Sequence, residues 1–148
     1  MRRISLKSLV CVFLFAFASQ ALAVDFIEVV SDDNFLIYVD FNSIEYRQDY
    51  ADNYIVVWTQ WFPRGETRKD MQKNIHEGIG HILFLDALNP ERRQWQALSS
   101  ITYGLKGNQL EDHSTRFSSI NYEEIPPGSY GSAIYDFVIK HYRNAKKK

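Results

Sequence analysis

The chain has 148 residues, a formal net charge of −1, and a composition that is 45% hydrophobic and 24% charged. This length predicts a single domain that can bury a core, and the charge balance argues against general nucleic-acid binding. Its single cysteine, Cys11, excludes a disulfide framework within the chain.

Residues 1–23 have the pattern of a cleavable export signal. Basic residues come first, an apolar run follows over residues 9–18, and a small-x-small site ends at Ala23. We expect cleavage between Ala23 and Val24, which leaves one domain over residues 24–148 with a short basic tail. The apolar run is too short to span a bilayer, which needs about 20 residues. No transmembrane span is therefore expected after processing.

Removal of this leader changes both the charge and the chemistry of the chain. It removes three basic residues and no acidic one, so the net charge falls from −1 to −4. It also removes Cys11, so the mature protein has no thiolate nucleophile and no cysteine ligand for a metal. Cys11 follows Val10 inside the apolar run instead of a small residue at its end, so we expect a protein without a lipid anchor.

Three apolar segments in the first half predict strands. Residues 26–30 and 35–40 flank the polar turn 31–34 and predict a hairpin. Residues 54–62 are β-branched and aromatic almost throughout, which suits a central strand with both faces covered. The Pro-Arg-Gly sequence at 63–65 ends this strand.

The second half adds further strands. Residues 79–86 predict a strand, whereas residues 66–78 are polar and give no assignment. Residues 93–103 fit a strand or a helix, but the glycine-containing turn that follows favours a strand in a hairpin with residues 109–110. Residues 117–124 predict a loop or an edge strand.

An amphipathic helix is predicted after Pro126-Pro127-Gly128-Ser129, with Ser129 as its N-cap. One helical face carries the residues Tyr130, Ile134, Phe137, Val138 and His141, widened by Tyr135, Ile139 and Tyr142. The last three could instead face a second subunit. Strands followed by one terminal helix predict an α+β fold, in which a twisted antiparallel sheet of about five to six strands carries the C-terminal helix on one face.

The histidines His76 and His81 are the candidate metal ligands. A zinc-protease helix needs histidines four residues apart, whereas these are five apart and separated by two glycines. We interpret the segment as a loop that enters a strand, and expect no metal site and no cofactor.

Other candidate catalytic or ligand-binding groups have simpler structural roles. Turn and strand-end positions explain the carboxylates of Asp32, Asp33, Asp40 and Asp86. Core packing explains Trp58, Trp61 and Trp95, although they could line a groove. Ser129 lacks the spacing of a nucleophile elbow. We therefore predict no catalytic residue.

The C-terminal end is basic because it carries Lys140, Arg143, Lys146, Lys147 and Lys148. One interpretation is a solvated helix end, where cations also interact favourably with the helix dipole. The other is a contact site for an anionic partner, such as lipid headgroups, lipopolysaccharide or a polyanionic host molecule.

The sequence resembles the surface-adhesin protein E family of bacterial exported proteins. The resemblance rests on Phe-Ile-x-Val-Val at 26–30, Ile37-Tyr38-Val39-Asp40 with Ser43-Ile44, and the apolar strand with Trp58. It continues with Tyr103 and Gly107 in a hairpin and with Pro127-Gly128-Ser129 before a final helix. It implies a sheet of about six strands with a helix on one face, export, adhesion to host matrix proteins, and no catalytic activity.

Two departures from that family carry predictions. The family commonly joins helix to sheet by a cysteine pair, and the corresponding residues here are Leu85 and Ile139, which we expect to pack together. The missing lipid-attachment site favours the periplasm over the cell surface.

Three hypotheses follow. The first is an exported, non-enzymatic binding domain that contacts a protein partner through a sheet edge or loop tips. The second is a soluble periplasmic accessory protein that binds an envelope component or a small ligand between helix and sheet. The third is a hydrolase built around His76, His81 and nearby carboxylates.

Overall fold

The computed structural model describes residues 25–48, 53–73, 75, 77–114 and 121–145. The expected leader, its cleavage site at Ala23 and Val24, His76, and Lys146, Lys147 and Lys148 lie outside the described residues.

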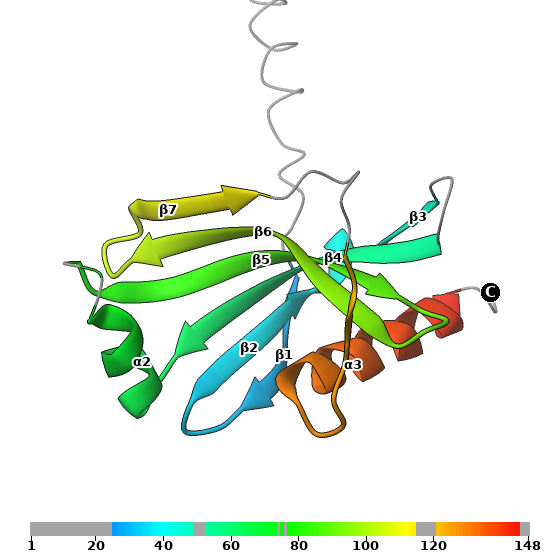
Figure 1. The fold of residues 1–148 in the computed structure, drawn as a ribbon, viewed down its shortest axis with the longest axis horizontal. Coiled ribbons are helices and arrows are strands. Elements are labelled where there is room, and N and C mark those ends of the chain that lie inside the picture. The colour runs from blue at the N-terminus through cyan, green and yellow to red at the C-terminus, as the bar shows by residue number, and fades with distance from the viewer. Residues whose placement is uncertain (1–24, 49–52, 74, 76, 115–120, 146–148) are drawn as a thin grey trace, which may run out of the picture.

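The fold is an antiparallel sheet with a C-terminal helix packed against it (Figure 1). Six strands form the main path in the order β1-β2-β4-β5-β6-β7, while β3 pairs with β4 and β8 with β6. The strands are β1 (Phe26–Ser31), β2 (Phe35–Asp40), β3 (Glu45–Gln48), β4 (Asn53–Pro63), β5 (Ile79–Asn89), β6 (Gln94–Gly104), β7 (Gln109–Ser114) and β8 (Glu123–Glu124). The predicted α+β class is confirmed.

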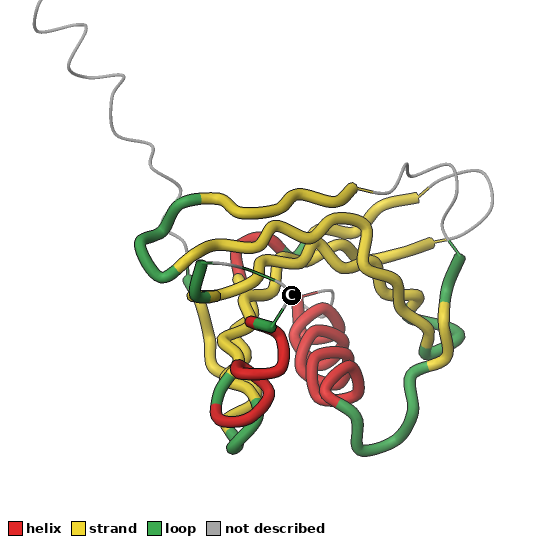
Figure 2. The backbone as a smooth tube through the Cα atoms, turned by 60° about the vertical axis from the view of Figure 1, so that its left-hand side comes forward, coloured by secondary structure: helices red, strands yellow, loops and turns green. Residues whose placement is uncertain are grey.

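The helices are η1 (Phe41–Ser43), α2 (Gly65–Gln72) and α3 (Tyr130–Ala145). In Figure 2, α2 and α3 lie on the same side of the sheet, and the sheet curves around α3. The opposite side carries no helix within the described part of the chain. We call this side the open face.

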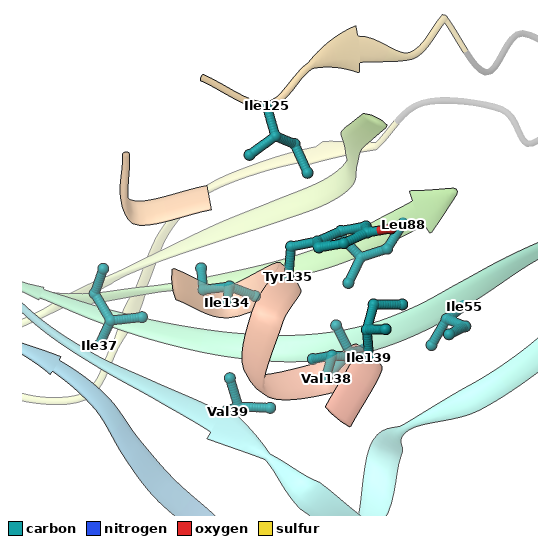
Figure 3. Packing of buried hydrophobic residues seen from close by; sticks show 10 residues of the cluster. Ile37, Val39, Ile55, Leu88, Ile125, Ile134, Tyr135, Val138 and Ile139 are labelled. Atoms are coloured by element: carbon teal, nitrogen blue, oxygen red, sulfur yellow. The ribbon is translucent and has the colours of Figure 1, made fainter. Parts of the chain in front are cut away.

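Alternation along the central strands sorts their side chains between the two faces. Ile55 lies opposite Leu88 and points toward α3, whereas the next residue, Val56, lies opposite Ala87 and points toward the open face. The core between sheet and helix contains Ile37, Val39, Ile55, Val57, Leu88, Ile125, Ile134, Tyr135, Val138 and Ile139 (Figure 3). Each of these side chains is at most 6% exposed.

Tyr135 and Ile139 therefore belong to the core, and the alternative that they face a second subunit is wrong. Tyr142 packs against the same cluster and stacks on Tyr46 of β3, with ring centroids 5.7 Å apart.

The expected contact between Leu85 and Ile139 is also wrong. Leu85 lies opposite Trp58 in the β4–β5 register and packs with Val56 and Ala87 on the open side, whereas Ile139 belongs to the core beneath α3. The two side chains therefore lie on opposite sides of the sheet. Successive side chains along a strand point to opposite faces, so an alignment that is shifted by one residue assigns a side chain to the wrong face.

The first turn of α3 is capped as predicted. The backbone N–H of Ser132 donates to the Ser129 Oγ at 3.1 Å, and that hydroxyl donates to the Pro126 carbonyl oxygen at 2.7 Å. An N-cap hydroxyl satisfies a helix donor that has no partner within the helix.

Replacing Ser129 by alanine is expected to lower the free energy of unfolding by about 1 kcal/mol, because the Ser132 N–H loses this acceptor. Chemical denaturation measures the change. Ser129→Asp, which keeps a capping oxygen, is the matched control and should remain close to the wild type. An equal loss in both variants would assign the effect to something other than the cap.

Candidate functional site

A groove of about 490 Å³ runs between the C-terminal half of α3 and the turn that joins β5 to β6. We call it the helix-edge groove. It is lined by Pro90, Glu91, Arg93, Tyr135, Asp136, Ile139, Lys140, Arg143 and Asn144. Two of the predicted contact residues for an anionic partner, Lys140 and Arg143, therefore lie in one groove.

Arg93 fixes the wall of this groove against the helix. It has a φ of 51° at the end of the turn, and its guanidinium donates to both carboxylate oxygens of Asp136, at 2.8 and 3.2 Å. It also donates to the Ser132 Oγ at 2.7 Å and lies 4.9 Å from the centroid of the Tyr135 ring. The Tyr135 hydroxyl donates in turn to the Pro90 carbonyl oxygen at 2.9 Å. These contacts hold turn and helix together as one unit.

Arg93 and Asp136 form an ion pair in which the two charges compensate each other. The hydrogen bond from Arg93 lowers the pKa of the Asp136 carboxyl, and the same bond raises the pKa of Arg93. The charge of Arg93 is thus already matched, and the cations left to meet a ligand are those farther along the helix.

Lys140 and Arg143 are those cations. Both are exposed, and neither forms an ion pair or hydrogen bond with another described residue. Among the described residues that line the groove, Glu91 is the one acidic side chain besides Asp136. Glu91 contributes one negative charge and the helix C-terminus about half a unit more, and the two positive charges of Lys140 and Arg143 exceed this sum. The groove can therefore accept a carboxylate, sulfate or phosphate group.

The histidines do not assemble a metal site in the described part of the chain. His81 lies on the open face, where its ring stacks on Tyr103 at 4.8 Å, and desolvation by burial lowers its pKa. His113 lies 3.8 Å from Glu111 on β7. Among the described residues, no group of three or more His, Cys, Asp or Glu side chains could hold a metal ion.

Two of the candidate carboxylates have structural roles at the ends of strands. Asp32 accepts the backbone N–H groups of Asn34 and Phe35, both at 2.8 Å, and the hydroxyl of Tyr130 at 2.9 Å, which ties the β1–β2 turn to α3. These bonds, led by the one from Phe35, lower the pKa of Asp32. Asp40 accepts the backbone N–H of Asn42 and begins η1.

Asp86 differs because it is completely buried in β5. The Thr59 hydroxyl donates to its Oδ2 at 2.8 Å, and the Trp61 indole N–H donates to the Thr59 Oγ1 at 3.0 Å. Its Oδ1 has no hydrogen-bond partner within the described part of the chain. Desolvation raises the pKa of Asp86 to about 7. Its isolation favours a structural role over a catalytic one.

The open face is a second concave surface, which the sequence interpretation missed. A depression of about 370 Å³ is lined there by Phe26, Asp40, Trp58, Gln60, Leu83 and Ile101. Trp61 and Trp95 pack against the core as predicted, but Trp58 belongs to this depression. The alternation along 54–62 could have separated Trp58 from Trp61, because they differ by an odd number of residues.

Comparison of the chain with protein-family models, with curated proteins and with solved structures found no match in any of the three. Within the described residues, no helix has the length and apolar character needed to cross a membrane.

Proposed function

We propose that this protein is an exported, non-enzymatic binding domain that contacts an anionic partner through the helix-edge groove. The observation that carries the proposal is the pair of exposed cations, Lys140 and Arg143, without an acidic partner among the described residues beside a groove of about 490 Å³. Arg93 keeps the opposite wall in place.

The sequence beyond the groove supports the same chemistry. Lys146, Lys147 and Lys148 follow directly in the chain and would add three positive charges near the end of α3. A partner with repeated anionic groups would bind this run of cations more tightly than a single small anion would, because each exposed charge pair contributes only about 0–1 kcal/mol.

The resemblance to the surface-adhesin protein E family gives the proposal its biological setting. The partner would then be a host matrix protein or an envelope component, and the protein would act in the periplasm or at the cell surface. The antiparallel sheet with a C-terminal helix is consistent with the resemblance at the level of fold class.

The alternative of a periplasmic accessory protein with a ligand between helix and sheet has less support. The side chains between α3 and the sheet are 0–6% exposed and fill that space with apolar groups. A small ligand would need a cavity with a few convergent polar groups instead. An envelope component with anionic groups would instead bind at the helix-edge groove, as the main proposal states.

Binding to immobilised heparin, a sulfated polysaccharide, tests the groove. The double variant Lys140→Gln/Arg143→Gln is expected to bind about 2- to 30-fold more weakly, since each exposed ion pair contributes about 0.2–1 kcal/mol. Its affinity should also depend less steeply on salt, because fewer charges are screened.

The matched control is Lys69→Gln/Lys106→Gln, which removes the same charge from α2 and from the β6–β7 turn. This control should retain wild-type binding. Equal losses in the two variants would mean that net charge alone matters, and no wild-type binding at low salt would refute the proposed anion site.

A further inference from the structure

The open face carries a row of aromatic rings beside its depression. Tyr38 lies 5.9 Å from Phe62, Phe62 lies 5.3 Å from His81, and His81 lies 4.8 Å from Tyr103, measured between ring centroids. The four residues come from β2, β4, β5 and β6, so the row crosses the sheet. All four are partly exposed.

The depression next to this row has an apolar floor. Phe26, Trp58, Leu83 and Ile101 supply its apolar surface, with Gln60 and Asp40 as the polar lining groups. Phe26 is 37% exposed at the start of an edge strand. Together, the ring row and the depression form a continuous apolar area on a face that no described helix covers.

Carboxylates surround this area. The register places Glu28 opposite Tyr38 and Asp112 opposite Ile101, and paired residues of neighbouring strands point to the same face. Asp40 lies in the depression itself. None of the three forms an ion pair with another described residue.

Two described cations lie at this face, and both already have partners. Arg64 reaches its rim, where the guanidinium donates to the Ser31 Oγ and to the Asp32 carbonyl oxygen, both at 3.2 Å. Arg47 lies opposite Tyr54, and its guanidinium lies 3.0 Å from the carboxylate of Glu45. Desolvation by burial lowers the pKa of His81, which disfavours a positive charge on its ring. The open face therefore combines apolar surface with a net negative charge.

We propose that the open face binds a cationic amphipathic peptide, with an apolar side chain in the Trp58 depression and Lys or Arg side chains against the surrounding carboxylates and rings. The carboxylates attract cations, and aromatic faces bind ammonium and guanidinium groups. Charge complementarity favours such a peptide over a second copy of the chain and over an anionic membrane. A second copy would bring like charges together, and an anionic membrane would be repelled.

Isothermal titration calorimetry with a synthetic 14-residue Leu/Lys amphipathic peptide tests the proposal. The wild-type protein should bind it, and a Leu/Glu peptide of the same pattern should not bind. Asp40→Asn/Asp112→Asn should weaken binding by about 2- to 30-fold. The amide introduced by Asp40→Asn would still offer an oxygen to the backbone N–H of Asn42, so the start of η1 is preserved.

Two matched controls distinguish binding at the open face from a general effect of net charge or of exposed apolar surface. Glu66→Gln/Asp70→Asn removes two carboxylates from α2 and should leave the affinity unchanged. Phe26→Ser should weaken binding about 3- to 10-fold, because its ring lines the depression, whereas Leu105→Ser, at a side chain 66% exposed in the β6–β7 turn, should not.

Three results would overturn the proposal. The first is equal weakening in the face variants and their controls. The second is equal binding of the Leu/Glu peptide. The third is a concentration-dependent dimer that Phe26→Ser abolishes, because this would assign the face to a second copy. None of these outcomes bears on heparin binding at the helix-edge groove.

Discussion

Replacing Asp86 by asparagine is expected to stabilise the protein at pH 8 and to flatten its stability profile between about pH 4 and pH 7. The Asp86 carboxyl is completely buried, and one of its oxygens has no hydrogen-bond partner within the described part of the chain. Desolvation raises its pKa from 3.8 to about 7, although the Thr59 hydroxyl opposes the shift. Asparagine has the same shape without the charge.

The sign of this pH dependence follows from the protons that Asp86 binds in the folded and unfolded states. Between pH 3.8 and about 7, the unfolded chain has lost this proton whereas the folded protein keeps it. The free energy of unfolding therefore falls as pH rises through this range, by a total of about 4 kcal/mol from this group alone. Below pH 3.8 the stabilisation is complete, and above about pH 7 it is lost.

Urea denaturation of the wild type and of Asp86→Asn between pH 5 and pH 8 measures the difference. The variant should gain stability relative to the wild type as pH rises. The lowered pKa values of Asp32 and Asp136 do not mask the effect, because the stabilisation that they provide is complete above their usual value of 3.8 and is lost only as pH falls below it. A constant difference between the two proteins across this range would contradict an ionising, buried Asp86.

Replacing Ile134 by alanine is expected to lower the free energy of unfolding by about 2–5 kcal/mol. Ile134 is 0% exposed and projects from α3 into the core cluster that also contains the strand residues Ile37 and Leu88 (Figure 3). Truncation loses the transfer free energy of the removed carbons and leaves a cavity that the sheet cannot close completely. Small domains have a total stability of about 5–15 kcal/mol, so this is a large fraction.

The midpoint of urea denaturation measures the loss, and Lys140→Ala on the exposed side of the same helix is the control. That control should stay within about 0.5 kcal/mol of the wild type. A small effect of Ile134→Ala would mean that α3 does not supply the core contacts, and the helix-edge groove would then lack a fixed wall.

Strong local patterns made the main strands and α3 predictable. Residues 54–62 are almost all β-branched or aromatic, and α3 combines an N-cap serine with an apolar face. Both features specify structure without information from the rest of the chain. They determined the α+β class and the face of the helix that is buried.

Elements without an apolar pattern were missed for a physical reason. The helix α2 has no buried residue, and its exposed side carries the ion pairs Glu66–Lys69 and Asp70–Lys73, both 2.6 Å long. Strand β3 is four residues long, and its pairing with β4 depends on a tertiary contact. Hydrophobic periodicity cannot detect such segments.

The candidate sites were only partly predictable. The basic character of Lys140 and Arg143 was visible in the sequence, but their groove depends on Arg93, which comes from a turn far earlier in the chain. The open face depends on strand register, and the error at Leu85 shows how a one-residue offset reverses a face.

The most direct test of the proposed function is chemical-shift mapping by NMR as a heparin-derived oligosaccharide is added to the mature protein at low salt. Binding at the helix-edge groove predicts that the largest backbone amide shifts fall at residues 91–93 and 139–144. Shifts confined to other strands or turns, or no shifts at all, would contradict the assignment of this groove as the contact site for an anionic partner.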